Sequence, residues 1–155
     1  MHTTLEIIHS WLRWFVLITA VWTIVRAIRG AAGHRAYLAQ DNKSSLFFMI
    51  SMDLQFLVGV LLYFVGGWAK NWTGGQITEV MNNSAARFFT VEHLAMMVLA
   101  WIIVHIGRSI VKKAKTDQQK HTKSLVYFGV AIVLILLAIP WPFRTGLGFH
   151  PWFRV

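Results

Sequence analysis

Two histidines within long apolar stretches are the residues best suited to chemistry. His9 lies just inside the first such stretch, and His93 stands beside Glu92 directly before the uninterrupted apolar run from Leu94 to Val104. Ionisable groups are costly where water is excluded, so those found there are functional candidates by default. A neutral imidazole binds a metal through one ring nitrogen while a hydrogen-bond acceptor holds the other.

The two histidines are expected at similar depths if their segments are helices that cross a membrane in the same direction. At 1.5 Å per residue, His9 lies about 6–8 Å along the first segment and His93 about 10–12 Å along the third. Helix boundaries read from sequence shift by about two to four residues, so these depths agree. Two imidazoles at one depth on different helices make an axial pair for a single, non-covalent b-type haem, a cofactor that four-helix bundles hold between facing helices.

Arg13 is the third residue that we assign to this site. It follows His9 by four residues and therefore shares its helical face. An arginine in an apolar layer needs a partner, for which the sequence offers a haem propionate, Glu92 or Asp53. Asp53 falls near the level of Arg13 in the second segment, so the favoured alternative is an Arg13–Asp53 pair that requires no haem.

Other interpretations of the histidines stay open at this stage. His9 and His93 also suit hydrogen bonding between helices, another metal, or a proton relay. His105 lies near the opposite end of its segment, where no other segment offers a histidine, and we expect it to be hydrogen-bonded or to extend to the membrane surface. His34 and His121 fall in expected loops, so a second bis-histidine haem is not expected.

The composition is that of a membrane protein with the lipid bilayer as its surroundings. The chain of 155 residues is 56% hydrophobic and 14% charged, with eight tryptophans. Its net charge of +9 comes mostly from residues that flank apolar segments, where they set orientation, so nucleic acid is not an expected partner. The absence of cysteine excludes disulfides, zinc–thiolate sites, iron–sulfur clusters and a covalently attached c-type haem.

Four apolar segments must position the candidate residues. We expect helices over about 5–28, 45–65, 86–110 and 125–139, with a tail over 140–155. The fourth segment ends at Pro140, which lacks the backbone donor that a continuing helix needs. Short connections make successive helices antiparallel. The sequence therefore predicts an all-α fold, a single integral-membrane four-helix bundle over residues 1–155.

Lysine and arginine counts predict the orientation of this bundle. The connections after the first and third segments, with the helix ends beside them, hold ten of these residues, and the opposite side holds four. Because cytoplasmic loops are enriched in basic residues, both termini are expected on the outer side. Binding of anionic lipid head groups is the other interpretation of the basic loops. The aromatic tail suits an anchor in the outer head-group layer, or a lid over a cofactor or quinone pocket.

Five motifs give the chain a resemblance to a known family: HSWLRW at 9–14, DLQFLVGVLLYF at 53–64, TVEHLAMM at 90–97, HIGR at 105–108 and IPWPFR at 139–144. Over nearly its whole length the chain resembles small four-helix membrane proteins of Bacteroidetes-type bacteria, named cytochrome B or cytochrome b-like. The resemblance implies a haem-binding, multi-pass protein of the bacterial inner membrane, whose outer side is the periplasm, and assigns the ligand role to His9 and His93. Some members carry a histidine at the position of Asp53, so a ligand scheme that uses the second segment does not carry over.

Two functions from different classes follow. The first is electron transfer by one b-type haem near the outer face, with quinol or a redox partner in a respiratory complex; the haem lies within one chain or between the chains of a homodimer. The second is a haem-free accessory subunit in which an internal polar network fixes helix register, formed by His9, Arg13, Asp53, Glu92 and His93. A transporter is disfavoured because neither broken helices nor repeats are visible. No nucleophile or phosphate-binding motif indicates a stand-alone enzyme.

Overall fold

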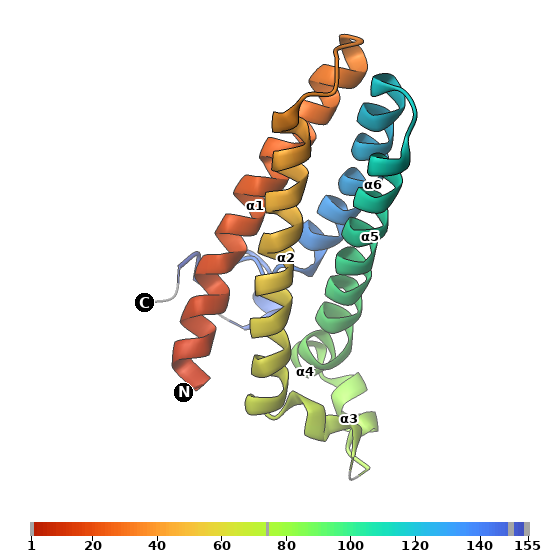
Figure 1. Cartoon of the computed structure of the whole chain (residues 1–155). Helices are drawn as coiled ribbons and strands as arrows, with labels where there is room; N and C mark the ends of the chain where they lie inside the picture. The colour runs from red at the N-terminus through yellow and green to blue at the C-terminus, as the bar shows by residue number, and fades with distance from the viewer. Residues whose placement is uncertain (1, 74, 149–150, 154–155) are drawn as a thin grey trace.

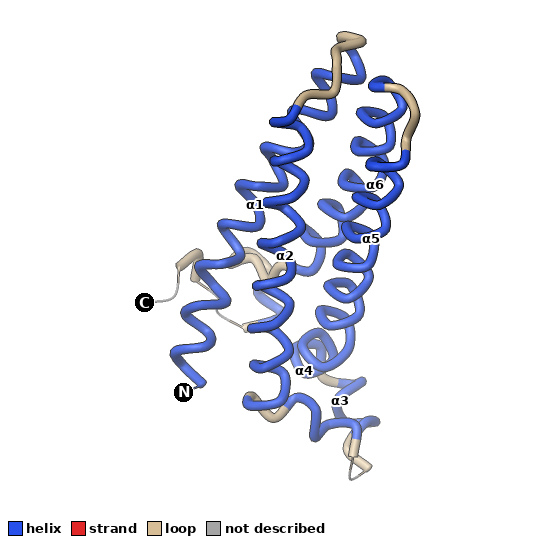
Figure 2. The backbone as a smooth tube through the Cα atoms, in the orientation of Figure 1, coloured by secondary structure: helices blue, strands red, loops and turns tan. Residues whose placement is uncertain are grey.

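The computed structural model describes residues 2–73, 75–148 and 151–153, and every regular element within these ranges is helical. The elements are α1 (His2–Ala32), α2 (Ala39–Val65), the 3-10 helix η1 (Trp68–Trp72), α3 (Ile77–Asn82), α4 (Ser84–Arg87), the π-helical segment η2 (Phe88–Glu92), α5 (His93–Lys113), α6 (Asp117–Ala138) and the 3-10 helix η3 (Thr145–Leu147). Helix covers most of the chain, and loops lie at the helix connections and in the tail (Figure 2).

Four spans are long and apolar enough to cross a membrane: Thr3–Ala32, Ala39–Val65, Ser84–Lys113 and Asp117–Ala138. The third joins α4, η2 and α5 into one continuous helix. This confirms the expected all-α fold with four membrane-length helices. The helices begin earlier than their apolar residues suggest, because polar residues cap them: the Leu38 amide donates to Asp41 Oδ2 at 2.7 Å, and the Gln119 amide donates to Thr116 Oγ1 at 3.2 Å.

The helices form a bundle of two antiparallel hairpins. The loop between α1 and α2 and the loop between α5 and α6 lie at one end, and the α3–α4 connection lies at the other with the N-terminus (Figure 1). Helices α1 and α6 also pack against each other, whereas α2 and α5 are less closely packed. Helices α1 and α5, which carry His9 and His93, therefore face each other diagonally across the bundle.

The interior is packed with apolar side chains, and the outside is apolar as well. Phe48 and Phe128 are fully buried and meet edge to face with ring centroids 6.0 Å apart. Large apolar residues also point outwards; Ile18 is 65% and Leu57 is 59% exposed. Apolar surface of this extent on the outside of a helical bundle indicates contact with lipid.

Glycines allow close approach between helices, as is typical of membrane bundles. A Cβ added at Gly107 in α5 would lie 2.5 Å from Tyr127 Cβ in α6, a separation that requires the two helices to move apart. At Gly129, by contrast, an added Cβ would meet only Ile24 Cδ1 at 3.8 Å, an ordinary contact.

We therefore expect Gly107→Ala to lower the free energy of unfolding by about 1–3 kcal/mol, the usual effect of overpacking. Gly129→Ala is the matched control and should be neutral or stabilising by about 0.5–1 kcal/mol, since alanine favours helix. Thermal unfolding in mild detergent, followed by circular dichroism, measures both. Equal effects of the two substitutions would contradict close packing of α5 on α6 at Gly107.

Candidate functional site

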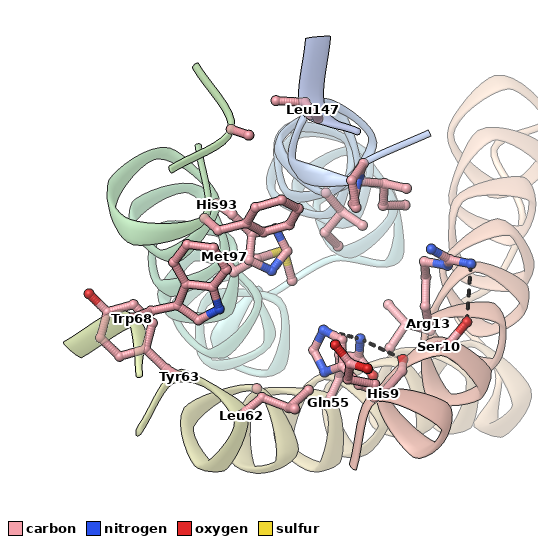
Figure 3. Close-up of a pocket in the computed structure, with 18 of the residues that line it drawn as sticks. His9, Ser10, Arg13, Gln55, Leu62, Tyr63, Trp68, His93, Met97 and Leu147 are labelled. Atoms are coloured by element: carbon pink, nitrogen blue, oxygen red, sulfur yellow. Dashed lines mark hydrogen bonds between the residues drawn. The ribbon is translucent and has the colours of Figure 1, made fainter. Parts of the chain in front are cut away.

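A cavity of about 450 Å³ opens among α1, α2, α5 and the end of α6. All three residues that the sequence assigned to a site, His9, Arg13 and His93, line it. Figure 3 shows them with apolar neighbours that include Leu62 and Met97. The volume lies within the range of about 300–1,000 Å³ that is usual for small-molecule and cofactor sites.

The cavity exists because α6 ends early. The helix stops at Ala138, two residues before Pro140, and the tail residues Pro140, Leu147 and Pro151 complete the cavity wall. Residues expected to cap the outer end of the bundle thus also cover a pocket. The tail lies across α1 because the Trp152 carbonyl accepts hydrogen bonds from α1 side chains.

The last carbonyls of α6 have no partner within the helix, as at any helix C-terminus. Side chains supply the donors: Trp141 Nε1 donates to the Leu136 carbonyl at 2.9 Å, and Arg144 Nη1 donates to the Leu137 carbonyl at 2.9 Å. The Ala138 carbonyl lies 2.8 Å from His93 Nδ1. The end of α6 is therefore fixed partly by the candidate ligand itself.

This contact fixes the tautomer of His93. A carbonyl oxygen can only accept, so Nδ1 carries the proton, and Nε2 of the neutral ring keeps its lone pair. The same arrangement, in which a backbone carbonyl holds one nitrogen of a histidine, orients metal-bound histidines in proteins. His93 therefore has the hydrogen-bonding pattern of a metal ligand without any rearrangement.

His9 is held on the opposite wall by α2. Gln55 Nε2 lies 3.2 Å from His9 Nε2 and 3.1 Å from the His9 carbonyl oxygen. Gly59 makes room for the ring, because a Cβ there would lie 3.2 Å from His9 Cε1. Within the described part of the chain, His9 Nδ1 and Gln55 Oε1 are buried without a hydrogen-bond partner. Such orphaned atoms are rare in native proteins and point to a missing partner.

Reversal of the Gln55 amide would change what His9 offers. The amide oxygen would then accept from His9 Nε2–H, and Nδ1 would keep a lone pair, at the loss of the bond to the His9 carbonyl. A lone pair on Nδ1 therefore requires Gln55 to rearrange, and Nδ1 lies on the side of the ring next to Gly59, where an added Cβ would be 3.7 Å from it. The two histidines differ in this respect.

The two imidazoles face each other at a separation that suits a shared metal. Their ring centroids lie 6.3 Å apart, with the ring planes at 68°. Metal–imidazole bonds of about 2.0–2.1 Å put the centroids of two opposed ligands roughly 6 Å apart. Among the described residues, no group of three or more His, Cys, Asp or Glu side chains is placed to hold a metal ion. The two imidazoles are therefore the only pair of candidate nitrogen ligands that the described residues place on this cavity.

Arg13 connects α1 to the tail. Its Nη2 donates to the Trp152 carbonyl at 2.6 Å, and the neighbouring Trp14 Nε1 donates to the same oxygen at 3.1 Å. Arg13 Nη2 also contacts Ser10 Oγ at 3.4 Å. As Arg13 lines the cavity as well, it places a positive charge where the tail closes over the histidines.

The expected Arg13–Asp53 pair is not formed, and that prediction was wrong. Asp53 Oδ1 instead accepts from Trp101 Nε1 at 2.7 Å and lies 3.3 Å from His105 Nε2. The cause is helix geometry: residues two apart differ by about 200° around the axis. Because Gln55 faces His9, Asp53 must point to another side of α2, towards α5. His105, which also contacts the Trp101 carbonyl at 3.1 Å, is hydrogen-bonded as expected.

Two further expectations need correction. Glu92, expected as a possible partner of Arg13, instead forms an ion pair with Arg87, in which Glu92 Oε1 lies 2.7 Å from Arg87 Nε. His121 was expected in a loop but lies in α6, where it is buried and packs directly against Gly30 of α1. The early helix start at Asp117, which its polar residues concealed, accounts for the second error.

The π-helical segment η2 was missed by sequence reasoning. The His93 amide donates to the Phe88 carbonyl, five residues back, so the segment ends at the candidate ligand. Tyr63 Oη donates to the Thr90 carbonyl at 3.0 Å, and Asn71 Nδ2 donates to Thr90 Oγ1 at 2.7 Å. Short π segments are often found at functional sites. No proline or glycine lies within Phe88–Glu92, so the sequence carries no local signal for it.

The site thus places two imidazoles on a largely apolar cavity, each with one nitrogen held by its own neighbour, and a cation beside them. Comparison of the chain with protein-family models, with curated proteins and with solved structures finds no match.

The contact between Arg13 and the tail can be tested by limited proteolysis. Arg13→Gln removes a charged donor, and hydrogen bonds of this kind contribute about 1.5–3 kcal/mol, so cleavage of the tail after Pro140 should become roughly tenfold faster. Arg29→Gln, which makes the same charge change at an exposed position on α1, should leave the rate unchanged. Mass spectrometry of the fragments measures both rates. An unaltered rate in Arg13→Gln would mean that other contacts hold the tail.

Proposed function

We propose that this protein binds one b-type haem within the membrane and transfers electrons, with His9 and His93 as the axial ligands. The observation that carries the proposal is the facing of the two imidazoles across a cavity, 6.3 Å apart, with His93 Nδ1 held by the Ala138 carbonyl. When bound, a b haem supplies reversible one-electron transfer at its iron.

The residues of the chain would orient this group and shield it. His93 keeps a fixed tautomer, and His9 offers a lone pair once the Gln55 amide turns. Apolar and aromatic side chains, among them Trp68 and Phe89, form much of the cavity wall and exclude water. Arg13 supplies a positive charge for a propionate. The absence of cysteine requires non-covalent attachment.

The orientation and setting of the site belong to the same proposal. By the distribution of lysine and arginine, the cavity end and both termini lie on the outer side. With the resemblance to cytochrome b-like proteins, this corresponds to the periplasmic side of a bacterial inner membrane. The electron partners are then quinol in the bilayer and a protein of a respiratory complex. The described histidines form no second facing pair, so the chain needs such a partner to carry electrons further.

The alternative is a haem-free accessory subunit whose polar residues form one internal network. Its support weakens because the five residues assigned to that network are divided: Asp53 contacts Trp101 and His105, and Glu92 pairs with Arg87. The contact that remains, between His9 and Gln55, would fix the register of α1 against α2 at only one level of the bundle.

Reduced-minus-oxidised absorption spectra, with haem quantitation, test the proposal on protein purified in mild detergent. We expect a low-spin b-type spectrum and about one haem per chain. His9→Ala and His93→Ala should each lower haem retention more than about tenfold, because removal of a ligand exceeds the 10–100-fold effect typical of its supporting residues.

His34→Ala is the matched control, since it removes a histidine in the loop between α1 and α2, and should leave the spectrum unchanged. Circular dichroism of each variant establishes that the helices are retained. Wild-type protein that folds but stays haem-free after reconstitution would overturn the proposal in favour of the accessory subunit.

A further inference from the structure

A second cavity, of about 180 Å³, lies near the end of the bundle that carries the two hairpin loops. It is lined by Tyr37 in the α1–α2 loop, Ser45 in α2, Arg108 and Lys112 in α5, and Lys120 in α6. A water molecule needs only about 10–15 Å³ of such space, so the cavity can hold a larger group. Three of these side chains are basic.

Arg108 is the central feature of this cavity. It is only 6% exposed, and its hydrogen bonds go to neutral acceptors: Ser45 Oγ at 2.6 Å, the Asn42 carbonyl at 3.1 Å and Asn42 Oδ1 at 3.2 Å. Within the described ranges no carboxylate forms an ion pair with it. Buried charges are normally paired, and an arginine held only by neutral groups leaves its charge uncompensated.

Nearby carboxylates are engaged elsewhere or lie at the rim. Asp41 Oδ1 pairs with Arg26 Nε at 2.7 Å, and Asp117 Oδ1 makes a long contact of 3.9 Å with Lys120 Nζ. Burial raises the pKa of the Tyr37 phenol, which therefore remains a hydrogen-bond donor at neutral pH. The cavity lining thus offers three basic side chains and the Tyr37 hydroxyl, beside the neutral side chains of Asn42 and Ser45.

The depth of Arg108 fits the head-group layer. It precedes Lys113, the last residue of α5, by five positions, or about 7.5 Å along the helix. Basic pockets between membrane helices at this level bind the phosphate-bearing head groups of anionic lipids. Arginine and lysine are also the side chains that bind phosphate most strongly, through charge-assisted hydrogen bonds.

We propose that this cavity binds a phosphate oxyanion, with Arg108, Lys112 and Lys120 as its cationic contacts. A lipid head group and free phosphate share this chemistry. The site lies at the other end of the bundle from the histidine cavity, and it does not depend on haem binding.

The test uses the full chain in neutral detergent with two probes: phosphatidylglycerol against phosphatidylcholine in mixed micelles, and inorganic phosphate against chloride at equal ionic strength. Native mass spectrometry counts bound lipid, and the unfolding midpoint reports binding of either probe. Working at about 0.3 M salt screens the long-range attraction of charges that do not touch the bound group, so that contacts within the cavity dominate.

The decisive variants are two matched pairs of lysines. Lys112→Gln with Lys120→Gln should weaken binding roughly tenfold or more, since each basic group near a phosphate contributes about 1 kcal/mol. Lys113→Gln with Lys115→Gln removes the same charge from positions that do not line the cavity and should change binding less than about twofold at this salt concentration. If the first double variant does not fold, the single variants Lys112→Gln and Lys113→Gln are compared instead. They change adjacent residues, and only Lys112 lines the cavity.

If the cavity variant weakens phosphatidylglycerol binding and phosphate has no effect, the result supports the site and identifies its ligand as a lipid head group. If phosphate alone shifts the unfolding midpoint and the cavity variant reduces that shift, the result supports the site and identifies its ligand as a free oxyanion. Equal weakening by both double variants, or no variant-sensitive binding of either probe, would overturn the proposal.

Discussion

The early end of α6 is the constraint on which the candidate site depends. Pro140 cannot donate the backbone bond that would extend the helix, so the last carbonyls must find donors on other elements. The Ala138 carbonyl accepts a hydrogen bond from Nδ1 of His93, and the tail side chains Trp141 and Arg144 donate to two other carbonyls. The same event therefore opens the cavity, fixes the tautomer of a candidate ligand and turns the tail across the bundle.

The bundle separates its polar chemistry into two ends. Apolar side chains fill the middle, where Phe48, Met52 and Phe128 are buried almost completely. The few polar groups there are paired at short range, as in the contact of 2.9 Å between Thr19 Oγ1 and Ser51 Oγ that joins α1 to α2. Because polar groups are costly in lipid, the proposed cofactor site at one end and the proposed anion site at the other each lie near the level where water and head groups begin.

Helix rotation decides which polar residues share a site. Gln55 and Asp53 are close in sequence, yet one contacts His9 and the other contacts Trp101. In a soluble helix, a polar stripe would reveal which face points inwards. In a helix that lipid surrounds, apolar residues cover both the inside and the outside, so this signal is lost. Depth along the axis can be read from such a sequence, but direction around the axis cannot.

The sequence alone determined the membrane composition, four apolar helices, the end of the fourth just before Pro140 and the matching depth of His9 and His93. These features follow from counting residues along an axis. Only the tertiary structure decided that Asp53 turns to α5, that His121 lies in a helix, that a π segment precedes His93 and that the tail covers the cavity. These features depend on contacts between elements far apart in the chain. The phosphate site at Arg108 belongs with them, since its residues come from a loop and three helices.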